Sequence, residues 1–240
     1  MIPILIAAAV ATAAPGAAAC PADSTSKASL CRAVEAEQSG KFAEAAAAFE
    51  NAAEMADRGD PAVDRMLAAA GNMWIAAGQP GKAALALDRA LTGTGLLADQ
   101  RGLALLDRAR AAEAQNDLKT ARLRLNLAIP SIGEDPFLWY FDAALAIREN
   151  DPVTAKMAIS RALTMIPNDP TILFEAGHVY QLAGEDAKAR DYWTRAAAAD
   201  PKGPTGMASK RALGMLEVPL TVTNQVAARP DGDGEGPGHR

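Results

Sequence analysis

The segment AGHVYQLAGEDAKARDYW, residues 176 to 193, carries a pattern of small and aromatic residues that occurs again along the chain. Residues 136–169 align with residues 170–203 at an offset of 34 residues. Self-similarity at a fixed period of this length predicts an array of stacked structural repeats. The matched pairs are Trp139 with Leu173, Ala143 with Gly177, Ala146 with Tyr180, Asn150 with Gly184, Ala155 with Ala189, Ala162 with Ala196 and Pro167 with Pro201.

Three more copies of the pattern lie upstream, in residues 26–59, 64–97 and 102–135. The first two intervals are 38 residues long, which adds about one helical turn to the period. Alanine is abundant and only 5% of the residues are aromatic. Because alanine favours helices and lets them approach closely, this composition indicates packed helices rather than a β-sandwich.

The period and the placement of small residues resemble the tetratricopeptide repeat (TPR) family, whose unit is a helix-turn-helix of about 34 residues. The resemblance covers most of residues 26–203. It implies an all-α, right-handed superhelix of about five helix-turn-helix units with a concave inner face. Small residues such as Gly177 and Ala189 would lie where helix axes cross most closely, and Gly40 and Gly184 would occupy the tight turns within repeats.

The boundaries of several helices are marked by an aspartate followed by a proline, a pair that suits a helix start. These pairs are Asp60-Pro61, Asp135-Pro136, Asp151-Pro152 and Asp169-Pro170. Residues 204–216 are predicted to form a C-terminal helix that caps the array. Residues 217–240 end in ARPDGDGEGPGHR and hold too little apolar surface to order themselves, so we expect a disordered tail.

The first nineteen residues, MIPILIAAAVATAAPGAAA, carry no charged side chain and end in small residues. This pattern predicts a secretory signal peptide, although it lacks the Lys or Arg that usually follows Met1. The alternative is a membrane anchor, but about 14 residues precede Pro15-Gly16 and a span needs about 20. We therefore expect export to the periplasm, and the style of the signal peptide indicates a bacterial protein.

The two cysteines, Cys20 and Cys31, have two alternative uses. In an oxidising compartment they could pair and tether the N-terminal segment 20–25 to the first helix. Alternatively, Ala17-Ala18-Ala19-Cys20 resembles a bacterial lipobox, although Ala17 stands where a lipobox prefers Leu, and Cys20 would then be lipidated and hold the protein at a membrane. A thioether cannot form a disulfide, so these uses exclude each other, and the sequence favours the disulfide or a soluble form.

Residues capable of catalysis do not form a recognisable motif. The two histidines, His178 and His239, have no metal-ligand spacing, no serine lies in a nucleophile motif, and Gly93-Thr94-Gly95 indicates only a turn. The net charge of −5 argues against general nucleic-acid binding, which relies on basic surface. We therefore expect no enzymatic activity, no cofactor, no metal and no nucleic-acid partner.

The TPR resemblance implies a groove for an extended peptide or protein partner. The first helix of each repeat would line it with its second, fifth, ninth, twelfth and thirteenth residues. In repeats three to five, the partner-binding residues that we expect are Arg110, Phe137, Tyr140, Arg148, Phe174 and His178. The arginines would orient acidic groups and the aromatic residues would anchor apolar ones, while His178 would be a hydrogen-bonded groove residue rather than a pH switch. The carboxylate clamp of some TPR proteins is excluded, because only Asn72 and Arg110 match its five groups.

These features predict a non-catalytic, protein- or peptide-binding scaffold or assembly factor of the bacterial cell envelope. Two alternatives stay open. The array could stack end to end as a self-associating structural protein, or it could be a non-catalytic accessory subunit of an envelope enzyme complex. No motif in the chain identifies the partner or the pathway.

Overall fold

The computed structural model describes residues 20–216, and within this range the chain consists of helices and the loops between them. The predicted signal peptide, residues 1–19, and the predicted tail, residues 217–240, lie outside the described residues. Among the described helices, none is long and apolar enough to cross a bilayer. The helices are α1 (Ser26–Gln38), α2 (Phe42–Glu54), α3 (Ala62–Ala76), α4 (Pro80–Thr92), α5 (Ala98–Ala114), α6 (Leu118–Ile132), α7 (Pro136–Arg148), α8 (Pro152–Met165), α9 (Pro170–Leu182), α10 (Asp186–Ala199) and α11 (Pro204–Leu216).

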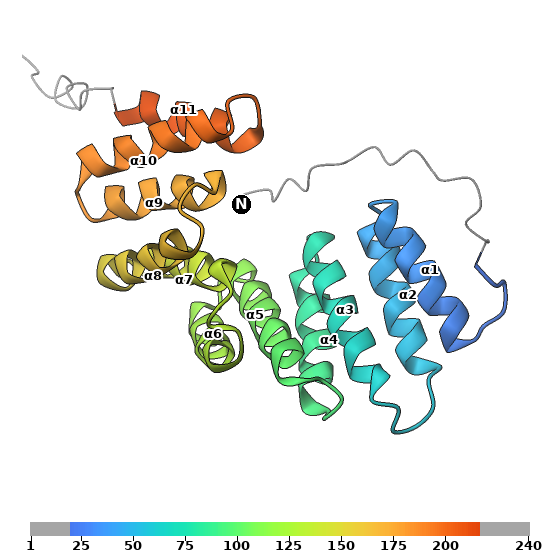
Figure 1. Cartoon of the computed structure of the whole chain (residues 1–240). Coiled ribbons are helices and arrows are strands. Elements are labelled where there is room, and N and C mark those ends of the chain that lie inside the picture. Colours follow the sequence, from blue (N-terminus) through green and yellow to red (C-terminus); the bar gives the residue numbers. More distant parts are fainter. Residues whose placement is uncertain (1–19, 217–240) are drawn as a thin grey trace, which may run out of the picture.

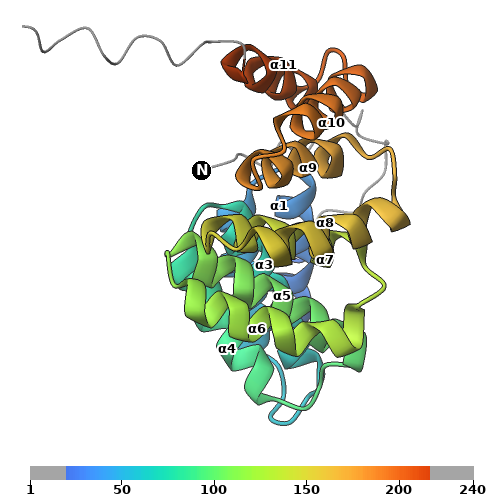
Figure 2. The same cartoon turned by 90° about the vertical axis from the view of Figure 1, so that its left-hand side faces the viewer.

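The helices stack in pairs, which confirms the predicted all-α repeat architecture (Figure 1). Each odd-numbered helix from α1 to α9 packs along the even-numbered helix that follows it, and each pair packs on the next. At the C-terminal end, α11 packs on α10. The result is a curved superhelical array. The first helices of the pairs line its inner face, and the second helices, such as α4, α6 and α8, form its outer face (Figure 2).

Each pair is closed by a tight turn that holds one residue in the left-handed region of backbone conformation. The φ angles at these turns lie between 57° and 73°. Glycine adopts this conformation without a steric penalty, and asparagine tolerates it better than most residues. The five turn residues are Gly40, Gly78, Asn116, Asn150 and Gly184. They occupy the same position in the five aligned repeats. The recurrence of Gly or Asn at this position therefore follows from the backbone conformation that the turn requires.

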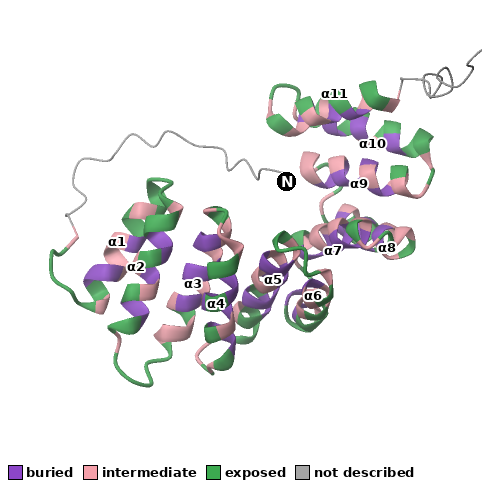
Figure 3. Ribbon diagram, turned by 180° about the vertical axis from the view of Figure 1, so that it is seen from behind, coloured by how far each residue is buried: buried purple, intermediate pink, exposed green. Residues whose placement is uncertain are grey.

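The two helices of a pair approach most closely at one contact that recurs between repeats. In repeat two, a Cβ on Gly71 of α3 would lie 2.3 Å from Leu87 Cγ of α4. In repeat five, a Cβ on Gly177 of α9 would lie 2.1 Å from the indole Nε1 of Trp193 on α10. Buried residues gather where neighbouring helices face one another (Figure 3). Because the interior is closely packed, a methyl group at either glycine would push the paired helices apart.

Helix starts follow the aspartate-proline pairs. The side chains of Asp135, Asp151 and Asp169 accept hydrogen bonds from backbone N–H groups in the first turns of α7, α8 and α9. Each is followed by a proline at the first helical position, where no N–H is needed. Asp60 acts in the same way one residue earlier, since its carboxylate accepts from the N–H of Ala62, where α3 begins.

The N-terminal segment is tied to α1 by a disulfide between Cys20 and Cys31, whose Cα atoms lie 5.6 Å apart. Arg32 Nη1 adds hydrogen bonds of 2.9 Å and 3.1 Å to the backbone oxygens of Pro21 and Asp23. Of the two uses of Cys20 considered above, the structure contains the disulfide.

Candidate functional site

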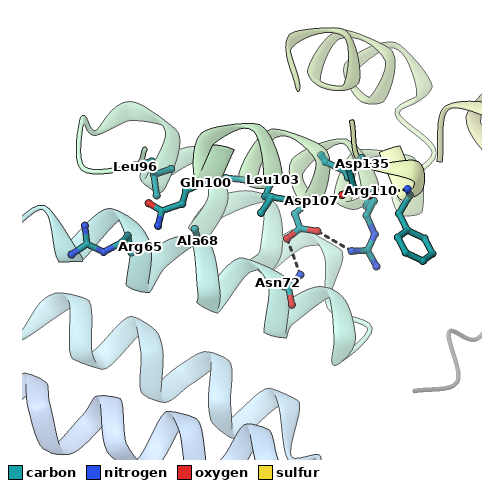
Figure 4. A pocket seen from close by; sticks show the side chains of 12 residues that line it. Arg65, Ala68, Asn72, Leu96, Gln100, Leu103, Asp107, Arg110 and Asp135 are labelled. Carbon is teal, nitrogen blue, oxygen red and sulfur yellow. Dashed lines mark hydrogen bonds and ion pairs between the residues drawn. The ribbon is translucent and has the colours of Figure 1, made fainter. Parts of the chain in front are cut away.

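An open cavity of about 450 Å³ lies on the inner face, where α3, α5 and the start of α7 come together (Figure 4). Its apolar lining consists of Ala68, Leu96, Leu103, Ala104, Leu106 and Phe137. Its polar lining consists of Arg65, Asn72, Gln100, Asp107, Arg110 and Asp135. An apolar hollow of this size with a few convergent polar groups is typical of a ligand-binding site.

A polar bridge joins α3 to α5 within this cavity. The Asn72 side-chain amide donates a hydrogen bond of 2.8 Å to Asp107 Oδ2, and Arg110 Nη1 donates one of 2.8 Å to Asp107 Oδ1. Figure 4 shows the carboxylate between its two donors. A guanidinium has five N–H groups, and Asp107 is the only hydrogen-bond partner of Arg110 within residues 20–216. Most of its donors are therefore available to a ligand.

The cavity lining carries two arginines, Arg65 and Arg110, and two aspartates, Asp107 and Asp135. Burial raises the pKa of the Asp107 carboxyl above its usual value, while the charge of Arg110 opposes that rise. Arg65 lies at the opposite end of the cavity from Arg110 (Figure 4), and its Nη1 makes a hydrogen bond of 3.3 Å to the backbone oxygen of Gly95. Arginine stays charged at any physiological pH. The cavity thus offers a cationic group at each end with an apolar surface between them.

The cavity contains two of the six expected partner-binding residues. Phe137 lies at its rim with 49% of its surface exposed, and Arg110 belongs to the polar bridge. The remaining four do not line the cavity; they are Tyr140, Arg148, Phe174 and His178. The cavity extends over repeats two to four, one repeat nearer the N-terminus than the groove expected over repeats three to five.

Tyr140 and Arg148 both contact other parts of the array, Tyr140 in the core and Arg148 at the surface. Tyr140 packs against the main hydrophobic core, and burial raises the pKa of its phenol, helped by the negative charge of Glu175. Arg148 donates hydrogen bonds to the backbone oxygen and the carboxylate of Glu113 and to the side chain of Asn116. It braces α7 against the turn between α5 and α6. These hydrogen bonds give Arg148 a structural role, and its role in orienting a partner's acidic group stays a prediction.

Phe174 and His178 belong to a closed aromatic cluster on α9 and α10. The His178 ring packs edge-to-face on Phe174 and on Trp193, with centroid distances of 4.5 Å and 5.4 Å. Glu175 beside them is only 3% exposed, and its Oε2, 3.9 Å from His178 Nδ1, has no hydrogen-bond partner within residues 20–216. Ring contacts rather than a groove hydrogen bond hold His178. No group of three or more His, Cys, Asp or Glu residues in the described range is arranged to hold a metal ion.

Sequence reasoning missed several residues that line the cavity. Asp107 is the sixth residue of its repeat and lies outside the positions that the family resemblance assigns to the groove. Leu96 and Gln100 lie in or beside the four-residue insertion before repeat three, which a 34-residue period does not cover. Leu103, by contrast, is the second residue of repeat three, so the same positional rule could have found it.

Comparison with solved structures defines the class of this molecule as a helical-repeat solenoid. The chain matches MamA with a TM-score of 0.59 and 17% identity, over 74% of this chain and 92% of MamA. It matches YrrB, described as "a TPR protein with an unusual peptide-binding site", with a TM-score of 0.57 and 15% identity, over 78% of this chain and 93% of YrrB. It matches PilW, described as a "widely conserved type IV pilus biogenesis factor", with a TM-score of 0.65 and 15% identity, over 76% and 81%.

Within that class, the chain has the TPR fold, as the repeat pattern predicted. At these identities the likeness establishes the fold alone. No family model matches the sequence, and neither does any of the curated proteins.

Proposed function

We propose that this protein is a non-catalytic binding scaffold that holds an extended peptide segment of a partner protein on the inner face of repeats two to four. The observation that carries the proposal is the cavity between Arg65 and Arg110, with its apolar surface and its unsatisfied donors. YrrB, which shares the fold, is described as having a peptide-binding site, and this likeness supports the proposal.

The chemistry of the cavity favours a segment with acidic residues at its two ends and an apolar residue between them. Carboxylates bind arginine through paired, charge-assisted hydrogen bonds, and the apolar surroundings strengthen such contacts. Leu103 between the arginines and Phe137 at the rim beside Arg110 are 46% and 49% exposed, and a partner's apolar side chains would cover them. Large, partly exposed aromatic residues at the centre of an interface contribute a large share of its binding energy.

Selection from a library of random displayed peptides tests this function. The chain from residue 20 onward should enrich peptides that combine Asp or Glu with apolar residues. The double variant Arg110→Gln and Phe137→Ala should bind the enriched peptides at least tenfold more weakly, which is a loss of about 1.4 kcal/mol or more of binding free energy. The matched control replaces Arg101→Gln and Leu97→Ala, two exposed residues outside the cavity, and should bind as the wild type does. Equal binding by all three proteins would show that the cavity is not the peptide site.

We further propose that the protein is exported and works in the periplasm of a bacterial envelope in its disulfide form. Residues 1–19 support export because they are apolar and uncharged. The Cys20–Cys31 disulfide also supports it, since such bonds persist in oxidising compartments.

The intact mass of the protein, expressed from its full sequence in a bacterium and fractionated, tests this location. We expect a periplasmic chain that lacks about the first nineteen residues and is lighter by two hydrogens than its reduced form. A chain with a diacylglyceryl group on Cys20 would identify a lipoprotein instead. A full-length cytoplasmic chain with both thiols free would contradict export.

A further inference from the structure

The outer face of repeats two, three and four carries a stripe of exposed apolar side chains that the inner-face cavity does not use. This stripe, called the outer stripe below, consists of Leu85 on α4, Leu123 and Leu127 on α6, and Val153 and Met157 on α8. Leu85, Leu123 and Met157 occupy the same position in three successive repeats and are 69%, 57% and 60% exposed. Repeats one and five have Ala47 and Asp191 there, so the stripe begins and ends within the array.

The three helices that carry the outer stripe lie one above another on the face turned to the viewer in Figure 2. Equivalent positions on stacked helices of a repeat array form a continuous line across them. Single exposed leucines are common on any protein surface, but a contiguous patch of large apolar side chains marks an interaction surface. The repetition of such residues in three repeats therefore distinguishes this face from an ordinary solvated one.

The same three helices are strongly basic, although the whole chain has a net charge of −5. Their basic residues are Lys82, Arg89, Lys119, Arg122, Arg124, Lys156 and Arg161. Their one acidic residue is Asp88, which already forms ion pairs with Arg108 and Arg124. This face thus has an excess of positive charge that the helices themselves do not neutralise.

Four of these basic residues surround the outer stripe and form what we call the basic rim: Lys82, Arg89, Lys119 and Arg161. All four are exposed, and none forms an ion pair with another residue in the range 20–216. Lys82 Nζ and the Arg161 guanidinium carbon lie 4.2 Å from the ring centroids of Trp74 and Trp139, so these two cations are positioned by ring contacts. Their charges remain available to a partner.

A hollow of about 280 Å³ adjoins the end of the outer stripe at Met157. Trp139 of α7 and Arg161 of α8 also line it, together with Asp142 of α7, whose carboxylate is paired with Arg122. An apolar wall beside a cation suits the side chain of one anchoring residue of a partner. The hollow therefore gives the surface a point of shape recognition in addition to its charge and its apolar line.

We propose that the outer stripe docks an acidic, amphipathic segment of a second protein. Its apolar side chains would cover Leu85, Leu123 and Met157, and its aspartates or glutamates would face the basic rim. Because the rim is basic, the complementary partner carries negative charge. Because an apolar line runs between the cations, that partner also needs an apolar face beside its acidic residues. This site lies on the opposite face from the peptide cavity, so the two proposals succeed or fail independently.

Fluorescence anisotropy with a synthetic probe tests the docking site. The probe is a labelled helix-forming peptide of about 18 residues, which spans about 27 Å at about 1.5 Å per residue, with Leu on one face and Glu beside it. The comparison peptide has Lys in place of every Glu. We expect the chain from residue 20 onward to bind the acidic peptide at least tenfold more tightly than the basic one, and more weakly at high salt.

Three variants locate the site. The double variant Leu123→Ser and Met157→Ser should bind the acidic peptide at least tenfold more weakly. The double variant Lys119→Glu and Arg161→Glu should do the same. The control double variant Leu97→Ser and Met215→Ser should leave binding unchanged. Leu97 and Met215 lie outside the stripe and are 66% and 70% exposed. Since all these side chains are exposed, the melting temperatures should stay close to that of the wild type. Because the cavity would also bind acidic peptides, all three variants are made in the Arg110→Gln and Phe137→Ala protein, which by itself should still bind the acidic peptide.

Several outcomes would overturn the proposal. Equal binding of the acidic and the basic peptides, or unchanged binding by the stripe variants, would show that the peptide binds non-specifically and that the outer stripe is not a docking site. Co-sedimentation with anionic lipid vesicles that depends on Leu123, without peptide binding, would make the partner a membrane. Concentration-dependent dimerisation that is lost in the Leu123→Ser and Met157→Ser protein, without peptide binding, would make it a second copy of this chain.

Discussion

Repeats three and five carry similar polar residues at the same two positions, but those of repeat three line the inner-face cavity and those of repeat five do not. Asp107 and Glu175 are each the sixth residue of their repeat, and Arg110 and His178 are each the ninth. In repeat three the carboxylate accepts hydrogen bonds from Arg110 and, across the helix boundary, from Asn72. In repeat five one carboxylate oxygen is buried without a hydrogen bond, and aromatic rings surround the histidine.

The difference between the two repeats originates on the second helix of each pair. Repeat three has Leu125 at its twenty-fourth position, and repeat five has Trp193 there. The indole of Trp193 passes over Gly177, contacts His178 and donates a hydrogen bond of 3.0 Å to the backbone oxygen of Phe174. A position that faces a ligand site in one repeat thus becomes part of a packed cluster in another.

The largest expected effect comes from removing that side chain. Trp193→Ala should lower the free energy of unfolding by about 3–5 kcal/mol, because the ring is 1% exposed and leaves a large void. Peptide binding at the cavity of repeats two to four should survive in the folded protein, since repeats contact only their neighbours. Denaturant unfolding followed by circular dichroism, together with peptide titration, measures both quantities. A loss below about 1 kcal/mol would mean that the aromatic cluster does not hold repeat five together.

Next in size is a pair of matched phenylalanine substitutions. Phe174→Ala should cost about 2 kcal/mol of stability, because this half-buried ring supports His178 and Trp193, and it should leave peptide affinity unchanged. Phe137→Ala should change stability by less than about 0.5 kcal/mol but weaken cavity peptides about tenfold. Thermal melting and anisotropy on the same two proteins distinguish the roles. A reversed pattern would place the binding face at repeat five.

A smaller effect is expected at the two acidic residues. Glu175→Gln should raise the free energy of unfolding by about 1 kcal/mol, because it replaces a buried carboxylate that lacks a hydrogen bond on one oxygen by a neutral group of the same shape. Asp107→Asn should give a smaller gain at neutral pH, since the loss of the charge-assisted bond from Arg110 offsets part of the burial cost that the neutral amide removes. Chemical denaturation of the two variants beside the wild type makes the comparison. Stabilisation by Asp107→Asn but not by Glu175→Gln would contradict it.

The smallest expected effect is a pH dependence due to Asp107. Burial raises the pKa of this carboxyl above its ordinary value of 3.8, so the folded protein favours the protonated acid. The resulting stabilisation is fully present below the ordinary pKa and is lost as pH rises through the folded-state pKa. The stability of the wild type relative to Asp107→Asn should therefore fall as pH rises from about 4 toward neutrality. Denaturation midpoints at several pH values test this, and a difference that grows in the opposite direction would refute it. Asp142, whose pKa burial also raises, is present in both proteins and cancels in the difference.

The array was predictable from the sequence because each position that keeps the same residue type from repeat to repeat does so for a local physical reason. The turn residues Gly78, Asn116 and Asn150 adopt positive φ, and small residues face the crossing partner at Gly71 and Gly177. Such constraints act over one repeat and therefore recur in the sequence. The pattern thus indicated the helices and their pairing without indicating which part of the inner face is open.

The candidate site was predictable only in part. The positional rule placed Arg110 and Phe137 on the inner face, where the cavity contains them. It placed Arg148 there by the same rule, but the partners of Arg148 are Glu113 and Asn116, 35 and 32 residues earlier. Contacts between neighbouring repeats depend on the geometry of stacking rather than on any local pattern. Whether a groove residue is free therefore had to come from the structure.

The disulfide at the start of the array determines which end of the solenoid unfolds first. Repeat arrays lose structure from their ends, because a terminal repeat is held by one neighbour only. The Cys20–Cys31 disulfide closes a covalent loop across the start of α1 and so restricts the unfolded chain there, whereas among the described residues α11 is held by packing on α9 and α10 and by hydrogen bonds to the preceding loop. Fraying and proteolytic trimming of the described array should therefore advance from α11 toward the inner repeats. The peptide cavity and the outer stripe, both centred on repeats two to four, are among the last parts of the molecule to be lost.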